Sequence, residues 1–509
     1  MSGASLNFSN KTKINNFSFF SVTPFILRVV TDSSSVSEKV LKKYFGFDSF
    51  REGQREIVDS IISDHDTLAI RSTGSGKSIC FQVPALYFPH LTLVISPLIS
   101  LMSDQVQALV NKNISAAFIN SSLPKLEIEK RVQQLKEEKI KLLYLSPEKL
   151  ESKNFSQLLT TLKISFIAVD ESHCISMWGH DFRPSYTRIP KFICRLNPRP
   201  TIAAFTATAT PMIADDIVNC LSLHKPKIFK QSSLRTNLQL NIIHCQHRAS
   251  KQLLLLKILK KHRQHSGIIY CSTRKATEQV AALINNLNFN QQLTRTNVLA
   301  YHGGLDSDQR ELIQQQFMDG RVKLISATNA FGMGVDKSDV RFVIHYQLSA
   351  NIENYYQEVG RAGRDGAQSY CYLLFEERDA FIQERMISQT APERIKIELN
   401  KLNTFLEMVY SQSCLQQKLA QYFGDDLEQS CNNCSNCQAP NIMFSEEEKE
   451  IWNKLHQHPQ LNQVPEQLKI LFTLINPQSK QEWLALPGVG EGLLQMLEQA
   501  NILGTCLNQ

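Results

Sequence analysis

The stretch TLAIRSTGSGKS, residues 67–78, carries the clearest signal for the fold. Residues 67–70 form an apolar run that predicts a buried strand, and a helical pattern follows Ser78. The glycines between them let successive backbone N–H groups curl around a phosphate at the start of the helix. Lys77 adds a point charge, and the Ser78 hydroxyl is a ligand for Mg²⁺. The pattern predicts a phosphate-binding loop made of Thr73, Gly74, Ser75, Gly76, Lys77 and Ser78.

Short apolar runs recur along the chain and alternate with helical patterns in residues 36–222 and again in residues 223–384. Continuous apolar strands separated by helices are typical of parallel sheets covered on both faces. We therefore predict an α/β fold with two tandem parallel-sheet domains, whose ligands bind beyond the carboxyl ends of the strands. The predicted strands are 67–70, 91–96, 140–146, 165–169 and 202–206 in the first domain, and 267–271, 298–301, 322–326, 341–345 and 370–375 in the second.

Length and composition set the outer limits of the interpretation. A chain of 509 residues is expected to form about three to four domains. Its net charge of +7 permits a nucleic-acid partner without requiring one. Because no apolar run reaches the length of about 18 residues that a membrane helix needs, neither a membrane span nor a signal peptide is expected, and the chain should stay in the cytosol. Residues 1–35 lack any period and are interpreted as a flexible leader.

The predicted strand 165–169 ends in two carboxylates, Asp170 and Glu171. Strands of a parallel sheet present their carboxyl ends at one edge, so this pair is expected near the phosphate loop. Asp170 is predicted to orient Mg²⁺ through its water shell, and Glu171 to polarise the water that attacks a γ-phosphate. Most acidic pairs are simply solvated surface, so the prediction depends on the loop about 90 residues earlier.

Two arginines, Arg361 and Arg364, lie in the stretch QEVGRAGRDG, residues 357–366, of the second predicted domain. Spaced three apart on a helical turn, their side chains can point to one face. That face can reach across a cleft and supply an arginine finger to the γ-phosphate when the domains close. The alternative is an arginine pair on a solvated helix face.

Four of the twelve cysteines group near the end of the chain in the pattern C-x16-C-x2-C-x2-C. Four thiolates can close a tetrahedral Zn²⁺ site with no open position, which predicts a role in folding rather than catalysis. Disulfides are not expected in a reducing cytosol, whereas an iron–sulfur cluster stays an alternative at this spacing. The predicted ligands are Cys414, Cys431, Cys434 and Cys437.

A series of further motifs surrounds these sites in a fixed order. They are FGF 45–47 through FREGQ 50–54, SPLISLM 96–102, LSPE 145–148, DESH 170–173, FTATAT 205–210, YHGGL 301–305 and ATNAFGMGVD 327–336. Together they resemble the RecQ family of superfamily 2 DNA helicases over residues 36–440. Arg71 replaces the usual first glycine of the phosphate loop, a departure that helicases of this general type tolerate.

The resemblance implies a domain organisation and a set of ligands. It implies two RecA-like domains, 36–222 for ATP binding and 223–384, followed by a small, mostly helical zinc-binding subdomain, 385–440, in which zinc is favoured over iron–sulfur. The amide of Gln54 can pair with the adenine edge, which favours ATP over GTP. The residues it adds to the nucleotide site are Phe47, Arg51, Gln54 and Gln357, and those of a DNA-contacting aromatic-rich loop are Trp178, His180, Phe182 and Arg183.

The function that the resemblance implies is an ATP- and Mg²⁺-dependent DNA helicase, moving 3′ to 5′ on single-stranded DNA and unwinding duplex DNA in recombination and repair. Its implied partners are single-stranded and duplex DNA, with single-stranded DNA-binding protein and recombination factors as candidates, in a bacterial cytoplasm or nucleoid. Two alternatives stay open. One is a translocase or annealing factor that unwinds poorly, and the other is a DNA-binding scaffold with a degenerate motor.

Residues 441–509 are too short for both a winged-helix domain and a further helical DNA-binding domain, which many RecQ helicases carry. We expect a short helical region, with a truncated winged helix or a helix-hairpin-helix as candidates. The stretch LALPGVGEG, residues 484–492, could offer backbone N–H groups to a DNA phosphate. A glycine-rich helix boundary is an equally good interpretation of it.

Overall fold

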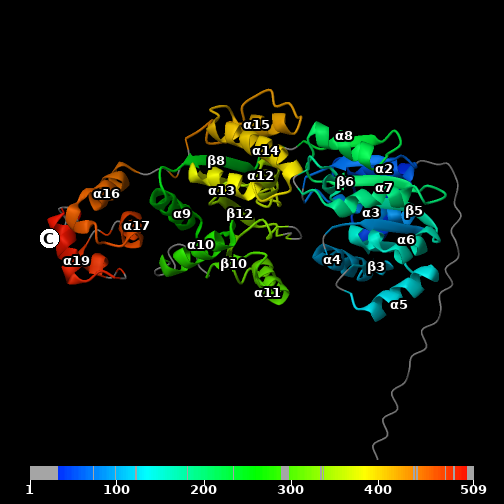
Figure 1. The fold of residues 1–509 in the computed structure, drawn as a ribbon, viewed down its shortest axis with the longest axis horizontal. Helices are drawn as coiled ribbons and strands as arrows, with labels where there is room; N and C mark the ends of the chain where they lie inside the picture. Colours follow the sequence, from blue (N-terminus) through cyan, green and yellow to red (C-terminus); the bar gives the residue numbers. More distant parts are fainter. Residues whose placement is uncertain are drawn as a thin grey trace, which may run out of the picture.

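The computed structural model contains two parallel sheets, each covered by helices, and two smaller helical units (Figure 1). It describes residues 33–502 with short gaps, so most of the predicted leader lies outside the described residues. Thr73 and His180 also lie outside them. The gaps are residues 73, 98, 121–122, 180, 233, 288–296, 333–334, 336, 440–441, 443–444, 476, 478, 485, 487 and 501.

The first domain is built on seven described strands in the order β3-β4-β2-β5-β6-β1-β7, all parallel. The strands are β1 Thr67–Ile70, β2 Leu91–Ile95, β3 Ala116–Ile119, β4 Leu142–Leu145, β5 Ile164–Val169, β6 Thr201–Thr206 and β7 Lys227–Lys230. Its helices are α1 Ser33–Val40, α2 Gln54–Ile62, α3 Lys77–Tyr87, α4 Ile99–Val110, α5 Lys125–Lys136, α6 Lys153–Thr160, α7 Arg188–Ile193 and α8 Pro211–Cys220.

The second domain has six described strands in the order β10-β11-β9-β12-β13-β8, again all parallel. With β8 in the place of β1 and β9 in the place of β2, this is the strand order of the first sheet without its last strand. The strands are β8 Leu238–His244, β9 Ser266–Tyr270, β10 Leu299–Tyr301, β11 Leu324–Ala327, β12 Val340–His345 and β13 Ser369–Phe375. The helices are α9 Arg248–His262, α10 Arg274–Leu287, α11 Ser307–Met318, α12 Ile352–Val359 and α13 Arg378–Ile387.

The ten strands predicted from continuous apolar runs all exist, and three others were missed: β3, β7 and β8. All three stand at an edge of their sheet, where one side of the strand is less buried and polar residues are tolerated. β7, with the sequence KIFK, is mostly exposed and pairs with β1. The first sheet therefore runs past the predicted boundary at residue 222, to Lys230.

Each sheet buries apolar side chains on both faces, which holds its carboxyl-end loops in place. In the first domain, Leu68 and Ile70 join the core on one face, and Ala69 joins the core on the other. In the second domain, Val343 joins the core on one face of the sheet and Phe342 joins the core on the other. No helix in the described part of the chain is long and apolar enough to cross a membrane.

The predicted zinc-binding subdomain begins with α14 Pro392–Tyr410 and α15 Leu415–Tyr422, which lie along the second sheet (Figure 1). Leu402, Phe405 and Cys434 share the hydrophobic core of that domain, so the subdomain is an extension of it. Beyond it, four helices form a unit on the far side of the second domain: α16 Glu446–Gln457, α17 Glu466–Ile475, α18 Lys480–Leu484 and α19 Glu491–Gln499.

Candidate functional site

The glycine loop leaves β1 and enters α3 as the sequence predicted. Gly74 and Gly76 have φ of +83° and +81°, a left-handed conformation that costs glycine little and other residues more. Lys77 is the first residue of α3, and its Nζ donates to the carbonyl of Arg71 at 3.1 Å. The Ser75 hydroxyl is buried and has no hydrogen-bond partner in the described part of the chain. The loop thus curls around an unsatisfied donor at a helix N-terminus, a geometry suited to an anion.

Gln54 and Arg51 grip this loop from the opening segment. Gln54 Nε2 donates to the carbonyls of Ser75 at 3.2 Å and Gly76 at 3.1 Å, while its Oε1 accepts from the Arg51 N–H. Arg51 Nη1 donates to the Gly74 carbonyl at 3.2 Å. The Gln54 amide, predicted to pair with adenine, is therefore engaged with the loop itself. Phe47, predicted to stack on the base, is 51% exposed.

The acidic pair follows β5. Asp170 is buried, and Ser96 Oγ and the Glu171 N–H donate to its carboxylate at 3.3 and 3.0 Å. Burial, and then the charge of Glu171, raise the pKa of Asp170 to about 7, although nearby Lys77 opposes the rise. Glu171 has a left-handed φ of 45°, a strained conformation that clusters at functional sites. The structure therefore brings the carboxylates and the lysine of the loop together.

Two contacts of this region were not predicted from the sequence. Gln105 of α4 donates from Nε2 to Ser78 Oγ at 2.9 Å and fixes the predicted Mg²⁺ ligand. His173 Nδ1 lies 2.9 Å from Thr206 Oγ1, which joins the acidic motif to the end of β6. Burial lowers the pKa of His173 to about 4, so the ring is neutral near pH 7. The motifs had pointed to His173 and Thr206, but not to their pairing.

The structure separates the two predicted arginines. A Cβ atom placed on Gly74 would lie 3.4 Å from Arg364 Cδ, so the Arg364 side chain crosses from the second domain to the glycine loop. Arg361 stays within the second domain, where it is buried and Nη1 donates to the Gly332 carbonyl. Gln357 is half-buried on α12. Arg364 is thus the arginine that reaches the loop.

The connection between the two sheets holds the arginine motif. Residues 231–237 join β7 to β8, and from them Arg235 Nη2 donates to the carbonyls of Ala362 at 3.2 Å and Gly363 at 2.7 Å. Asn237 Nδ2 donates to the same Gly363 carbonyl at 2.8 Å. These contacts fix the peptide groups between the two arginines, and no sequence pattern had predicted them.

The aromatic-rich loop folds back on the short 3₁₀ helix Ser172–Ile175 behind the acidic pair. The Arg183 N–H donates to the Cys174 carbonyl at 2.9 Å, and a Cβ on Gly179 would strike the His173 carbonyl at 2.5 Å. Arg183 pairs with Asp181 and also donates to the Pro97 carbonyl at 3.3 Å. Trp178 is 43% exposed, which is unusual for so large an apolar ring. The loop is therefore rigidly attached to the acidic motif and presents one aromatic face to solvent.

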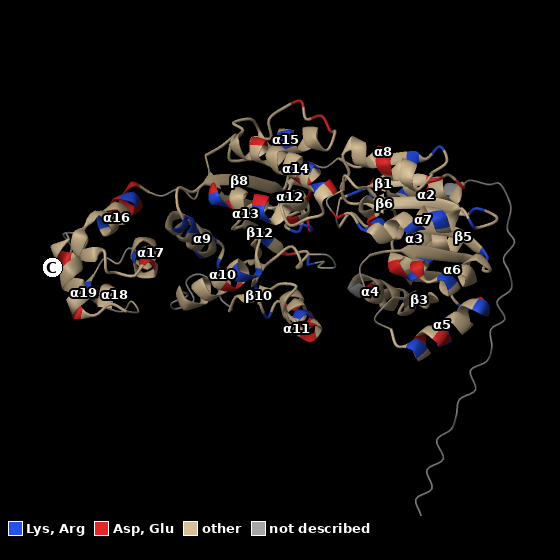
Figure 2. Cartoon of the chain, in the orientation of Figure 1, with Lys and Arg blue, Asp and Glu red and all other residues tan. Residues whose placement is uncertain are grey.

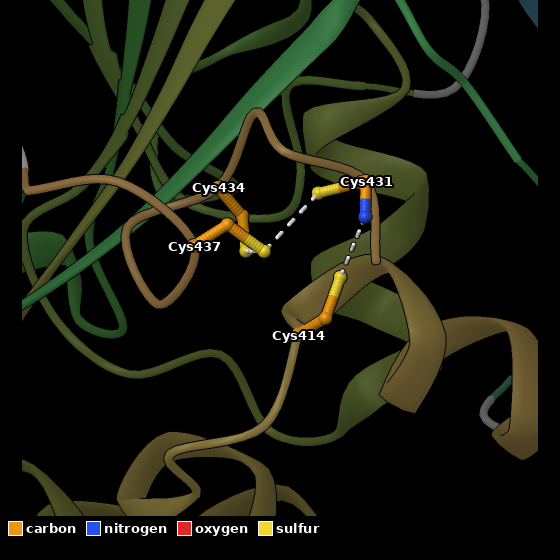
Figure 3. A group of neighbouring side chains, drawn as sticks. All are labelled: Cys414, Cys431, Cys434 and Cys437. Carbon is orange, nitrogen blue, oxygen red and sulfur yellow. Dashed lines mark hydrogen bonds between the residues drawn. The ribbon is translucent and has the colours of Figure 1, made fainter. Parts of the chain in front are cut away.

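The four predicted zinc ligands converge (Figure 3). Their sulfurs lie within 4.8 Å of one another, with 3.5 Å between those of Cys434 and Cys437 and 4.0 Å between those of Cys431 and Cys437. A tetrahedral site with Zn–S bonds of about 2.3 Å needs sulfurs about 3.8 Å apart. Burial raises the pKa of Cys414, but N–H donors from Cys431 and Gln417 outweigh it and bring the pKa to about 7. Spacing and chemistry fit zinc.

Comparison with protein families finds three models that match successive segments of the chain. The DEAD/DEAH box helicase model matches residues 51–217, the helicase conserved C-terminal domain matches 250–366, and the RecQ zinc-binding model matches 377–438. The ATP-dependent DNA helicase RecQ of Synechocystis is 37% identical over 398 residues, which are 77% of this chain and 81% of that protein. The chain belongs to the RecQ family. The zinc-binding assignment of the cysteine cluster is thereby confirmed at the level of the subdomain.

Other RecQ relatives are as similar but longer. The ATP-dependent DNA helicase RecQ of Bacillus subtilis is 41% identical over 405 residues, and the RecQ of Pasteurella multocida is 41% identical over 402. These matches cover 79% of this chain but only 66% and 62% of those proteins. The chain thus spans less than two thirds of the length of these relatives.

Solved structures agree with the predicted fold class of two RecA-like domains. Dbp5 of S. cerevisiae bound to RNA and ADP BeF3 matches with a TM-score of 0.55 at 15% identity, over 72% of this chain and 98% of that one. Lhr of Mycobacterium smegmatis bound to ssDNA and AMP-PNP matches with a TM-score of 0.53 at 16% identity, over 82% and 57%. At these identities the likeness concerns the fold alone.

Beyond the RecQ zinc-binding match, the C-terminal helical unit has its own small core and docks on α9. Lys260 Nζ donates to the Leu474 carbonyl at 3.1 Å, and Trp452 stacks on His247. Its residues 445–502 include eight glutamates and four lysines, without aspartate or arginine. In Figure 2 the ribbon of α16 carries both red and blue segments, and that of α9 carries blue ones. Gly488, with φ of +82°, lies between α18 and α19. The described part of this unit has no strand, and its acidic charge does not favour a DNA phosphate.

Proposed function

We propose that this chain is an ATP-dependent DNA helicase of RecQ type that moves 3′ to 5′ along single-stranded DNA. The observation that carries the proposal is the contact of Arg364 with the glycine loop at Gly74, because it makes a nucleotide site out of two domains. A site of that kind changes when the domains close or separate, which is how a motor converts hydrolysis into movement. Membership of the RecQ family supports DNA as the strand.

The chemistry follows from the placement of each side chain. The loop N–H groups and Lys77 bind the β- and γ-phosphates, and Ser78 and Asp170 would hold Mg²⁺, which neutralises phosphate charge when bound. Glu171 orients a water whose oxygen attacks the γ-phosphorus. The bond from that phosphorus to the bridging oxygen breaks, giving ADP and phosphate. Arg364 neutralises the charge that spreads over the equatorial oxygens.

The DNA strand is proposed to run over the aromatic-rich loop. Exposed Trp178 offers a face on which a base stacks, a contact worth about 1–3 kcal/mol and independent of sequence. Arg183 is held by Asp181 and by the Pro97 carbonyl, so its role is to fix the loop as well as to approach phosphate. His180 belongs to the same proposed contact by its place in the sequence. Zinc, held by the four cysteines, stabilises the subdomain.

The proposed setting is recombination and repair in the cytoplasm or nucleoid of a bacterial cell, with single-stranded DNA-binding protein and recombination factors as partners. It is supported by the bacterial RecQ relatives and by cysteines that form no disulfide in the described residues.

The test is ATP hydrolysis with and without single-stranded DNA. Lys77→Ala and Glu171→Gln should each lower DNA-stimulated turnover by on the order of 100-fold or more, because they remove phosphate binding and water activation. Wild-type protein that shows no DNA stimulation, or variants that retain it, would contradict a working motor and leave a DNA-binding scaffold. A matched RNA strand that stimulates as well as DNA would contradict the choice of substrate.

Strand separation needs its own measurement. We expect unwinding of a forked duplex with a 3′ single strand, and none of a blunt duplex. The C-terminal unit, which is acidic and has no strand among its described residues, favours a second candidate, a translocase or annealing factor that separates duplex poorly. Strong DNA-stimulated ATPase without fork unwinding would select that candidate.

A further inference from the structure

Helix α14 connects the aromatic-rich loop of the first domain with α12 of the second, the helix that precedes Arg361 and Arg364. Near its start, Arg394 Nη2 donates to the Gly179 carbonyl at 3.2 Å, although the two residues are 215 positions apart in the chain. The Arg394 guanidinium also lies 5.7 Å above the ring of Phe182. A charged donor to a carbonyl and a cation–π contact are each stronger than ordinary surface contacts. The start of α14 therefore holds the loop at two points.

Further along α14, the same face reaches α12. Lys401 Nζ lies 3.8 Å from the carboxylate of buried Glu353, and the ring of Phe405 packs on Tyr355 with centroids 5.3 Å apart. Arg394 and Lys401 are separated by two helical turns, and Glu398 lies between them on that face and pairs with Arg394. One stripe of α14, half-buried at Arg394, Glu398 and Lys401 and buried at Phe405, thus runs from the loop to α12.

Helix α12 ends at Val359, and the arginine motif follows it directly. The contacts of α14 therefore connect the loop with the helix that precedes the segment in which Arg364 lies at Gly74. In the first domain, the loop is also close to the acidic pair, because Gly179 packs against the carbonyl of His173, which follows that pair by two residues. Both halves of the nucleotide site are in mechanical contact with one loop.

We infer that Arg394 is a positioning residue that couples the aromatic-rich loop to the arginine motif, so that DNA on the loop accelerates ATP hydrolysis. This inference rests on the proposed function, in which the loop contacts DNA. The two aromatic side chains then have different tasks. Phe182 anchors the loop to α14, and Trp178 stacks on bases.

The test compares Arg394→Ala with Lys396→Ala, which removes an exposed charge from the same helix. For Arg394→Ala we expect the ratio of DNA-stimulated to DNA-free ATP turnover to fall about tenfold, while affinity for single-stranded DNA by fluorescence anisotropy changes less than about threefold. Lys396→Ala should change neither. A simple loss of structure would lower both quantities together, so the split separates positioning from folding.

Arg394→Lys keeps the charge and the aliphatic stem but loses the planar fork, and it should restore part of the ratio. It also carries the test if Arg394→Ala does not fold. A ratio for the Arg394 variants equal to that of Lys396→Ala would overturn the inference, and so would an equal loss of DNA affinity. Trp178→Ala tests the proposed DNA contact of the loop separately from the role of Arg394. If that variant retains wild-type DNA affinity and stimulation, the proposed role of the loop fails, independently of the result for the Arg394 variants.

Discussion

The two parallel-sheet domains share a strand order but place different chemistry at equivalent strand ends. After β1 the first domain has the glycine loop, with Lys77 donating to a backbone carbonyl. After β8, in the equivalent place, the second domain has Lys251, which is buried and bound to Asp379 at 2.6 Å. One lysine can turn to an incoming anion, and the other is already neutralised inside the protein.

The residues that follow β5 in the first domain and β12 in the second also differ in charge. β5 delivers Asp170 and Glu171, whereas β12, in the equivalent position, delivers Tyr346 and Gln347. In the second domain neither a glycine loop nor a carboxylate pair stands at these strand ends, and its Arg364 side chain lies against the glycine loop of the first domain. One scaffold used twice thus carries the predicted phosphate-binding groups in one copy and, in the other, the arginine that we propose responds to a nucleotide between them.

The largest expected effect is the loss of ATP turnover when the arginine of the second domain is removed. Arg364→Ala should lower DNA-stimulated ATP turnover by on the order of 1000-fold, as loss of an arginine finger does, with little change in thermal stability. Arg361→Ala should cost less turnover and more stability, because Arg361 is buried in its own domain. Steady-state ATPase and thermal unfolding of both variants check this, and the reverse order would contradict the assignment.

The next effect tests the neutralised lysine. Asp379→Ala should destabilise the protein by about 3–5 kcal/mol, because it leaves the Lys251 ammonium buried and unpaired. The double replacement Lys251→Met with Asp379→Leu should recover most of that loss, since it buries no charge. Urea unfolding gives both values. An Asp379→Ala protein as stable as the wild type would show that the pair is hydrated rather than buried.

The smallest effect concerns the grip on the loop. Gln54→Ala removes two donors to loop carbonyls and should raise the KM for ATP about tenfold with a smaller change in kcat. Kinetics with ATP and GTP sharpen the prediction. If Gln54 recognises adenine, Gln54→Ala should raise the KM for ATP more than the KM for GTP. Equal losses for both nucleotides would assign Gln54 to the loop alone.

Sequence patterns were sufficient wherever a function depends on neighbours in the chain. The glycine loop, the acidic pair and the cysteine cluster are local, and interior strands are apolar throughout because both faces are buried. Of the four strands at sheet edges, β3, β7 and β8 escaped prediction and β10 did not, and the exposed KIFK of β7 illustrates how an edge strand can lack a continuous apolar run.

The contacts that were missed are made by long polar side chains between distant segments. Gln105 with Ser78, Arg235 with Gly363 and Arg394 with Gly179 each join parts of the chain that only folding brings together. A glutamine or arginine in an isolated sequence is most often solvated surface, so nothing local marks these residues. The predicted helical turn does not form at Arg361 and Arg364, which lie beyond the end of α12 in a turn through Gly363 with φ of +58°, so the choice of Arg364 over Arg361 depends on a backbone turn that the spacing did not predict.

The seven-residue connection 231–237 between β7 and β8 limits how far the second domain, with its arginine motif, can move from the first. Even fully extended it spans only about 25 Å, so the second domain can never withdraw far from the nucleotide. A group tethered at that range is present at an effective concentration in the millimolar range or above. Arg235 and Asn237 attach the arginine motif to this same tether. In the proposed mechanism, the activating arginine is therefore supplied by the chain itself.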